Sequence, residues 1–290
     1  MSILLEEIED LLARFEASPS LLEPSQLRDR YDALDRLDAL LGDANASSPT
    51  PSAADAELLR RAQLLRQRLE ASNDQLCRAM RTGIQQGSPP VLLTRLLNEN
   101  VSPAPGLSFD FLDELLAGIL QLEQPDPPPA HPPDGMVFYQ PTPARHIFHL
   151  LRLTALTAAD VLIDLGCGLG HVPLLTSICT GACGIGIERE AAYVALARRC
   201  AEQLKLDRVT FCQQDARDAD LSTGTVFYLY TPFTGSILSS VLHRLQQESR
   251  SRPIRIGTFG PCTETIANEK WLQSETRPDP DHITVFCSRC

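Results

Sequence analysis

Apolar residues in the first third of the chain recur every three or four positions, which is the spacing of one face of an α-helix. The stretch SILLEEIEDLLARFE, which begins at Ser2, shows this spacing, and so does SQLRDRYDALDRLDALLG from Ser25 to Gly42. A longer run extends from about Ala53 to Met80, and two shorter apolar segments follow it. The pattern predicts about five amphipathic helices, each of which needs a partner for its apolar face.

After residue 135 the pattern changes, because short β-branched runs alternate with helical segments. The predicted strands are Val161–Asp164, Gly184–Glu188, Arg208–Cys212, Thr225–Tyr230, Ile254–Phe259 and Ile283–Cys287, with a weaker one near Trp271. The predicted helices are Ala144–Leu153, His171–Thr176, Glu190–Leu204 and Gly235–Gln247. This alternation is typical of an α/β fold with a doubly wound sheet.

The segment QPDPPPAHPPDG, residues 124–135, separates the two patterns. Proline lacks a backbone N–H and clashes within a helix, so this segment is predicted to be a stiff, extended connector. The predicted organisation is therefore a helical N-terminal domain (1–123), a proline-rich linker (124–135) and an α/β domain (136–290).

The formal net charge of −11 is unevenly distributed. Residues 1–134 hold 22 acidic and 11 basic side chains, whereas residues 135–290 hold 15 of each. Neither part is basic, which disfavours nucleic acid as a partner. The chain has no long uncharged apolar stretch, and its first residues carry acids where a signal peptide is basic, so we expect a cytoplasmic protein without a membrane segment.

The nine cysteines show no regular framework spacing, which favours reduced thiols. The pair Cys287 and Cys290 has the spacing of half a zinc site, but no second pair accompanies it. We therefore predict no metal centre.

The segment VLIDLGCGLG places Gly166, Cys167, Gly168 and Gly170 between the first predicted strand and the following helix. Doubly wound sheets bind ligands at this position, and a turn rich in glycine lets a ligand contact backbone N–H groups. The G-x-G-x-G spacing, with Asp164 before it, differs from the G-x-G-x-x-G of dinucleotide-binding proteins. It therefore favours S-adenosylmethionine over NAD, with the Asp164 carboxylate holding the ammonium group of the methionine end.

Two further acids follow the next two strands. Glu188, at the end of the second strand, is expected to accept hydrogen bonds from the ribose hydroxyls. Asp215, after the third strand, is expected to bind the adenine amino group, although Asp218 and Asp220 lie near enough in sequence to take its place.

VLIDLGCGLG, GIGIERE and QQDARD resemble the first three motifs of class I S-adenosylmethionine-dependent methyltransferases, over residues 136–290. The resemblance implies a Rossmann-like, seven-stranded sheet. FYQPTPARHIFHLL is similar to the Y-x-P-T-P segment of a small bacterial and archaeal group that includes protein-lysine methyltransferases, with a weaker likeness to Dot1-like enzymes. This likeness implies that Tyr139 and Thr142 cover the methionine end of the cofactor.

The fourth predicted strand ends in YTPF, where the methyl acceptor of such enzymes meets the cofactor, so Tyr230 and Thr231 are the candidate catalytic residues. The tetrad resembles the N-P-P-F type of methylases that act on bases, but Thr231 replaces the Asn or Asp, which disfavours base methylation. An aromatic lining that includes Tyr228 and Phe233 favours a neutral amine.

The predicted function is methyl transfer from S-adenosylmethionine, with a protein amino group, a lysine by resemblance, as the acceptor. Two alternatives remain open at this point. One is a small-molecule methyltransferase, and the other is a non-catalytic cofactor-binding module whose helical domain docks a partner.

Overall fold

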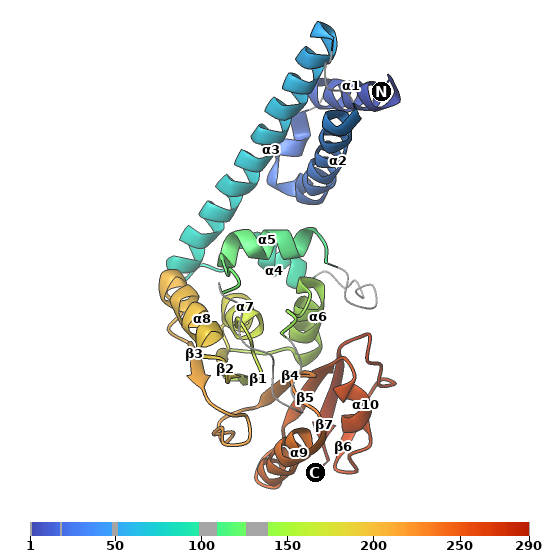
Figure 1. The fold of residues 1–290 in the computed structure, drawn as a ribbon. Helices are drawn as coiled ribbons and strands as arrows, with labels where there is room; N and C mark the ends of the chain where they lie inside the picture. The colour runs from blue at the N-terminus through green and yellow to red at the C-terminus, as the bar shows by residue number, and fades with distance from the viewer. Residues whose placement is uncertain (1, 18, 48–51, 99–108, 126–138, 290) are drawn as a thin grey trace. The chain divides into compact units, whose positions relative to one another are not determined.

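The structure is a computed structural model that describes residues 2–17, 19–47, 52–98, 109–125 and 139–289. The chain divides into two compact units, Met1–Met80 and Arg81–Cys290 (Figure 1). The predicted boundary at 124–135 does not coincide with this division, because helices α4 (Val91–Asn98) and α5 (Phe111–Leu120) pack on helix α6 (Ala144–Thr154) of the second unit. Most of the predicted linker, from residue 126, lies outside the described residues.

The first unit contains the predicted amphipathic helices. They are α1 (Ser2–Ala17), α2 (Leu27–Ser47) and α3 (Ala53–Gln85), with two short 3-10 helices, η1 (Pro19–Leu22) and η2 (Pro24–Gln26), between α1 and α2. Helix α3 extends five residues beyond the predicted end at Met80. The apolar faces meet in one buried cluster, in which Ile8, Leu37 and Leu69 have no exposed surface.

One buried charge links most elements of this unit. The Arg30 side chain, on α2, is fully buried. Its Nε donates to Asn73 Oδ1 of α3 at 2.5 Å, and its Nη1 donates to the carbonyl oxygens of Leu21 at 2.7 Å and Glu23 at 3.1 Å. The guanidinium thus connects the segment between α1 and α2 to α3.

Arg30→Leu should destabilise the first unit by about 3 kcal/mol, because it leaves the buried Asn73 side chain and two partly buried backbone carbonyls without this donor. Urea unfolding of the full chain, followed by circular dichroism, measures this loss. Arg14→Leu, at an exposed position of α1, is the matched control and should change the unfolding free energy by less than about 0.5 kcal/mol. Equal stability of the two variants would show that the Arg30 network contributes little.

The second unit is built on a seven-stranded sheet, as predicted. Its strands are β1 (Val161–Leu165), β2 (Cys183–Glu188), β3 (Val209–Gln213), β4 (Val226–Tyr230), β5 (Arg255–Phe259), β6 (Leu272–Ser274) and β7 (Thr284–Ser288). The order is β3-β2-β1-β4-β5-β7-β6, in which β1 to β5 are parallel and β7 is antiparallel to both its neighbours. The weak strand expected near Trp271 is β6.

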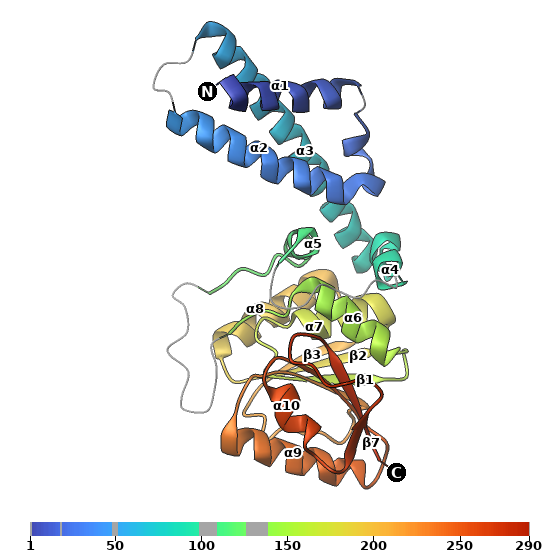
Figure 2. The ribbon, with the colours of Figure 1, turned by 90° about the vertical axis from the view of Figure 1, so that its right-hand side faces the viewer.

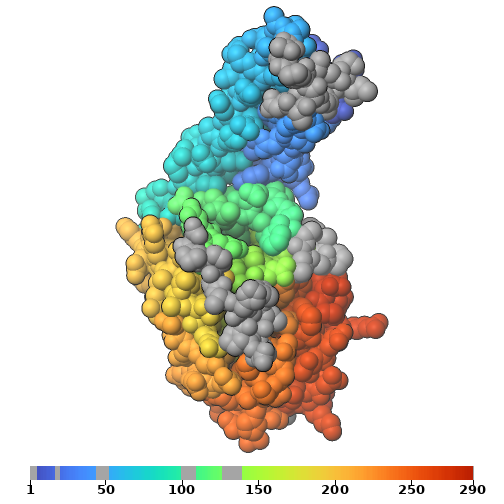
Figure 3. Space-filling view, viewed as in Figure 1, coloured from blue at the N-terminus to red at the C-terminus, as the bar shows by residue number. Residues whose placement is uncertain are grey.

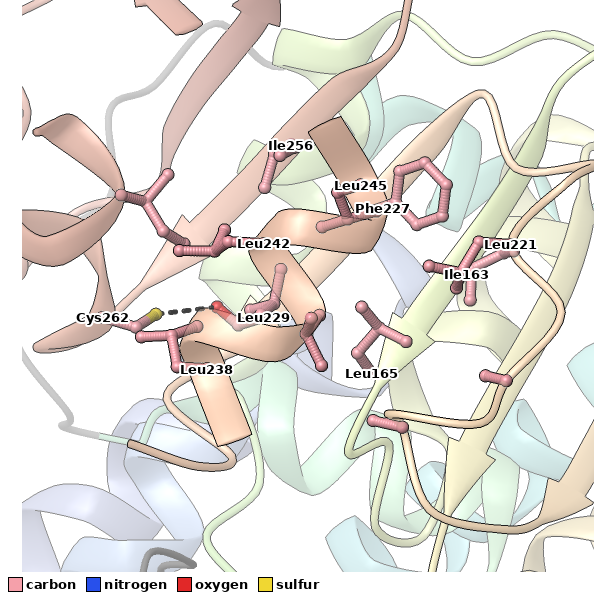
Figure 4. Close-up of a cluster of buried hydrophobic side chains, with 14 of the residues drawn as sticks. Ile163, Leu165, Leu221, Phe227, Leu229, Leu238, Leu242, Leu245, Ile256 and Cys262 are labelled. Carbon is pink, nitrogen blue, oxygen red and sulfur yellow. Dashed lines mark hydrogen bonds between the residues drawn. The ribbon is translucent and has the colours of Figure 1, made fainter. Parts of the chain in front are cut away.

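Helices cover both faces of this sheet. Helices α6, α7 (His171–Thr180) and α8 (Ala191–Leu204) lie on one face, and α9 (Gly235–Ser249) and α10 (Cys262–Ala267) lie on the other (Figures 1 and 2). Leu238, Leu242 and Leu245 of α9 face Phe227 and Leu229 of β4 in a fully apolar cluster (Figure 4). Burial of these side chains fixes the register of the strands, since a shift by one residue would expose the apolar set.

Helix α7 is four residues longer than the predicted segment that ended at Thr176. The parallel register brings the carboxyl ends of β1 to β5 to the same edge of the sheet. The segments that follow these strands are therefore neighbours in space, which is the condition for a shared ligand site.

Candidate functional site

A cavity of about 550 Å³ lies at the carboxyl ends of the parallel strands. Every one of the five parallel strands contributes to its wall through the residues that follow it or end it. The contributors include Asp164, Gly166 and Cys167 at β1, Glu188 at β2, Gln214 and Asp215 at β3, Tyr228, Tyr230, Thr231 and Phe233 at β4, and Phe259 at β5. Tyr139 and Thr142, which precede α6, also line the cavity.

The turn between β1 and α7 has no room for side chains at three of its positions, Gly166, Gly168 and Gly170. Gly166 has a φ of +88° and Gly168 a φ of +52°, a region that favours glycine. A Cβ atom on Gly166 would lie 2.2 Å from Pro232 Cβ, and one on Gly168 would lie 2.0 Å from the ring of Tyr139. Gly168 and Gly170 therefore do not line the cavity themselves; they allow Tyr139 and Phe211 to pack against the turn.

Glu188 connects the glycine turn to the next helix. Its Oε2 accepts from the Gly168 N–H at 2.8 Å, and its Oε1 accepts from the N–H groups of Arg189 at 2.7 Å and Glu190 at 2.9 Å. Each carboxylate oxygen can accept two hydrogen bonds, so Oε2 retains capacity for a ligand hydroxyl. The backbone donors hold this carboxylate in one orientation at the cavity wall.

Asp164 is the buried carboxyl group of the site. Its side chain is 4 % exposed, and the described residues give it no hydrogen bond or ion pair. Burial, with the Glu188 carboxylate as a second cause, raises the pKa of Asp164 well above its usual value. Because a buried carboxylate is costly without a partner, this position fits a cationic group of a ligand in the cavity.

Tyr139 lies over the glycine turn and contacts two further residues. Its hydroxyl is 3.4 Å from His171 Nδ1, and its ring centroid is 4.8 Å from that of Tyr193. Burial lowers the pKa of His171 to about 4, so this imidazole is neutral at physiological pH. Thr142 Oγ1 forms a hydrogen bond of 3.0 Å with the buried Tyr228 hydroxyl.

Asp215 reaches the cavity wall, whereas Asp218 and Asp220 do not line it. Arg217 holds the Asp215 carboxylate through two side-chain bonds, Nε to Oδ1 at 2.9 Å and Nη2 to Oδ2 at 2.8 Å. This ion pair lowers the pKa of Asp215 to about 2. The carboxylate therefore stays charged, and Oδ2 can still accept from a ligand amino group.

At the tip of β4, Tyr230 and Thr231 have different surroundings. Tyr230 lines the cavity, its ring is 4.9 Å from that of Phe259, and burial raises its pKa to about 12. The Thr231 hydroxyl donates to the Phe259 carbonyl at 3.1 Å and accepts from the Cys262 N–H at 3.1 Å. Thr231 thus fastens the β5–α10 turn, and Tyr230 is the side chain that faces the cavity.

Sequence reasoning gave no role to His171, Tyr193 or Phe259, although all three line the cavity. His171 directly follows the glycine turn, so its place in the sequence already indicated that it lies near the site. Tyr193 and Phe259 reach the site only through the packing of their helix and strand. Within the described ranges, no three His, Cys, Asp or Glu side chains are arranged to hold a metal ion. Cys287 is a free thiol, and Cys290 lies outside the described residues.

Residues 156–231 match the model of a family described as a methyltransferase domain. The strand order and the glycine turn around this segment are those of the class I methyltransferase fold. The match thus supports an S-adenosylmethionine-dependent methyltransferase. No protein among curated sequences matches the chain. In the part of the chain that the structure describes, no helix is long and apolar enough to cross a membrane.

The chain is also similar to several solved structures. An RNA methyltransferase from Salinibacter ruber, in complex with S-adenosyl-L-homocysteine, is 27% identical, with 51% of this chain and 92% of that chain covered and a TM-score of 0.40. A Geobacter sulfurreducens S-adenosylmethionine-dependent methyltransferase is 26% identical (39% and 47% covered, TM-score 0.32). A Pyrococcus abyssi tRNA (uracil-54, C5)-methyltransferase is 15% identical (51% and 39% covered, TM-score 0.40).

The raised pKa of Asp164 predicts pH-dependent cofactor binding. In the free protein this carboxyl takes up a proton at a higher pH than an ordinary aspartate, and only its ionised form pairs with a ligand ammonium. The affinity for S-adenosylhomocysteine should therefore fall as the pH is lowered, starting at a higher pH than the ionisation of an ordinary aspartate would give, with protons released on binding. Calorimetry in two buffers of different ionisation enthalpy measures both effects.

Asp164→Asn should flatten this pH dependence and weaken binding about ten- to a hundredfold, the equivalent of one charge-assisted hydrogen bond. Asp281→Asn is the matched control, because Asp281 also lines the cavity but lies in the exposed loop before β7. It should leave the affinity unchanged. An Asp164→Asn protein that is folded and binds like the wild type would remove Asp164 from the ligand site.

Proposed function

We propose that the domain transfers a methyl group from S-adenosylmethionine to the side-chain nitrogen of a protein lysine. The observation that carries the proposal is the aromatic end of the cavity, where Tyr228, Tyr230, Phe233 and Phe259 surround the tips of β4 and β5. An apolar, aromatic channel disfavours an ammonium ion and favours the neutral amine, which has the lone pair that attacks the methyl group.

The order of the strands supports an orientation of the cofactor with its adenine end at β3 and its methionine end at β1. Asp215 follows β3, Glu188 is the last residue of β2 and Asp164 is the second-last residue of β1, and these strands are adjacent in that order. Neighbouring strands lie about 4.8 Å apart, so the three carboxylates suit the adenine amino group, the ribose hydroxyls and the methionine ammonium in sequence. This direction leaves the aromatic end, at β4, for the acceptor.

The cofactor supplies a methyl group activated by attachment to a sulfonium. The residues of the chain contribute orientation, since an in-line displacement depends mainly on the placement of the two reacting groups. Tyr230 positions the acceptor, and Thr231 holds the β5–α10 turn that follows Phe259. Bulk water takes up the proton of the lysine ammonium before attack, so no general base beside the sulfonium is needed.

The properties of Cys167, which lines the cavity, and of the nearby Cys262, which does not, argue against ring-carbon methylation, because that reaction requires a nucleophile to activate the ring. Burial raises the pKa of Cys167 well above its usual value, and burial also raises the pKa of Cys262. Neither thiol is ionised at physiological pH, so neither is a ready nucleophile. The likeness of the Tyr139–Pro143 segment to the Y-x-P-T-P group supports a protein lysine over other amines.

Incubation of the full chain with radiolabelled S-adenosylmethionine and a cell extract tests the acceptor. Label in protein that survives nuclease treatment, located on lysine by hydrolysis and amino-acid separation, is the expected result. Label in nuclease-sensitive material would instead match the RNA acceptor named for the Salinibacter ruber structure. Label only in small molecules would favour a metabolite acceptor, and tight cofactor binding without any transfer would favour a non-catalytic module.

Tyr230→Ala should lower the transfer rate at least tenfold while changing the dissociation constant of S-adenosylhomocysteine less than about twofold, because the lost contact orients the acceptor. Tyr230→Phe, which keeps the ring, should retain most of the rate. Scintillation counting of labelled product and calorimetry measure the two effects. If Tyr230→Ala weakens cofactor binding and transfer equally, Tyr230 belongs to the cofactor pocket.

A further inference from the structure

Helix α5 lies outside the residues that match the family model. A hydrogen bond links its first turn to the first residue of α6, on the cofactor side of the domain. Asp110 and Asp113 form a capping box at the start of α5, in which Asp113 Oδ2 accepts from the Asp110 N–H at 2.8 Å. The other carboxylate oxygen, Asp113 Oδ1, accepts from the Ala144 N–H at 2.8 Å. One carboxylate therefore serves the first turns of two helices.

Helix α6 needs this acceptor. Its N-cap residue is Pro143, whose side chain forms no capping bond, and Ala144 is 1 % exposed, so water does not reach its N–H. A buried N–H without an acceptor destabilises the fold, and a carboxylate at a helix N-terminus is also favoured by the helix dipole. Asp110 Oδ2 approaches Arg145 Nη1 at 4.0 Å and adds a weaker link between the same two helices.

The start of α6 is continuous with the segment that covers the glycine turn. Thr142 lies two residues before Ala144 and bonds the Tyr228 hydroxyl beside Asp164. Tyr139 lies five residues before Ala144 and packs on Gly168. The atoms of α5 (green) lie against those of α6 (yellow-green) in the space-filling view, so the two helices pack on each other next to this segment (Figure 3).

We propose that Asp113 is a positioning residue for the cofactor: through the Ala144 N–H it fixes the start of α6 and thereby holds Tyr139 and Thr142 over the methionine end of the ligand. The inference rests on the proposed direction of the cofactor, in which that end lies between Asp164 and the glycine turn. Asp113 itself does not line the cavity. It acts on the ligand through the backbone.

A comparison of two ligands distinguishes a positioning role of Asp113 from a general effect of this residue on the stability of the protein. S-adenosylhomocysteine carries the amino-acid end, whereas 5′-methylthioadenosine has the same adenosine but lacks that end. In the full chain, Asp113→Ala should weaken S-adenosylhomocysteine binding about tenfold and 5′-methylthioadenosine binding less than about twofold. Calorimetry measures both constants, and circular dichroism establishes that each variant is folded at the assay temperature.

Asp113→Asn has the same shape but one acceptor oxygen for two N–H donors, so it should weaken S-adenosylhomocysteine binding only about threefold. The neighbouring, exposed Glu114→Ala is the control and should bind both ligands like the wild type. A folded Asp113→Ala variant with wild-type affinity, or with equal losses for both ligands, overturns the proposal. If Asp113→Ala does not fold, unchanged S-adenosylhomocysteine affinity in Asp113→Asn overturns it.

Failure of the underlying function is distinguishable from failure of this inference. If the wild-type protein binds neither ligand, the cofactor site itself is wrong and the role of Asp113 falls with it. If the wild type binds both ligands with equal affinity, the amino-acid end makes no contact and the proposed direction of the cofactor is wrong. If the wild type prefers S-adenosylhomocysteine and Asp113→Ala loses this preference, the result supports both the proposed direction of the cofactor and the role of Asp113.

Discussion

The geometry of the site depends on one close approach, that of the Tyr139 ring to the backbone of Gly168. A Cβ atom on Gly168 would lie 2.0 Å from that ring, so the contact exists only because the turn lacks a side chain there. The same turn presents its Gly168 N–H to Glu188, and its first residue, Gly166, lies two positions after Asp164. The positions of a covering aromatic ring, a buried carboxyl and a wall carboxylate are therefore all set by a few backbone atoms.

The three carboxyl groups of the cavity are chemically distinct although their side chains are similar. Asp164 is desolvated and has a raised pKa, whereas Asp215 is paired with Arg217 and has a pKa lowered to about 2. Glu188 is held by three backbone N–H groups. One end of the cavity thus offers a group that gains most from a cationic partner, and the other end offers a fixed acceptor whose charge is already balanced.

The local part of this arrangement could be predicted from the sequence. Strands of β-branched residues, glycine at 166 and 168, and acids at strand ends follow from short-range rules, and the parallel order brings Asp164, Glu188 and Asp215 to one edge. Contacts between distant segments could not be predicted, because amphipathic spacing shows that a helix needs a partner but not which one. For that reason the division after Met80, the bond from Asp113 to Ala144 and the engagement of Thr231 by the β5–α10 turn emerge only from the structure.

The packing of Tyr139 on Gly168 also provides a position at which the cofactor pocket can be redesigned. Truncation of Tyr139 would remove a six-membered ring from directly above a peptide unit that carries no side chain of its own, which opens a recess at one defined place in the wall. A synthetic cofactor enlarged at the facing position would fit this recess and would clash with the native ring. A protein with Tyr139 truncated, used together with such an enlarged cofactor, would allow its methylation products to be labelled separately from those of other methyltransferases in the same extract.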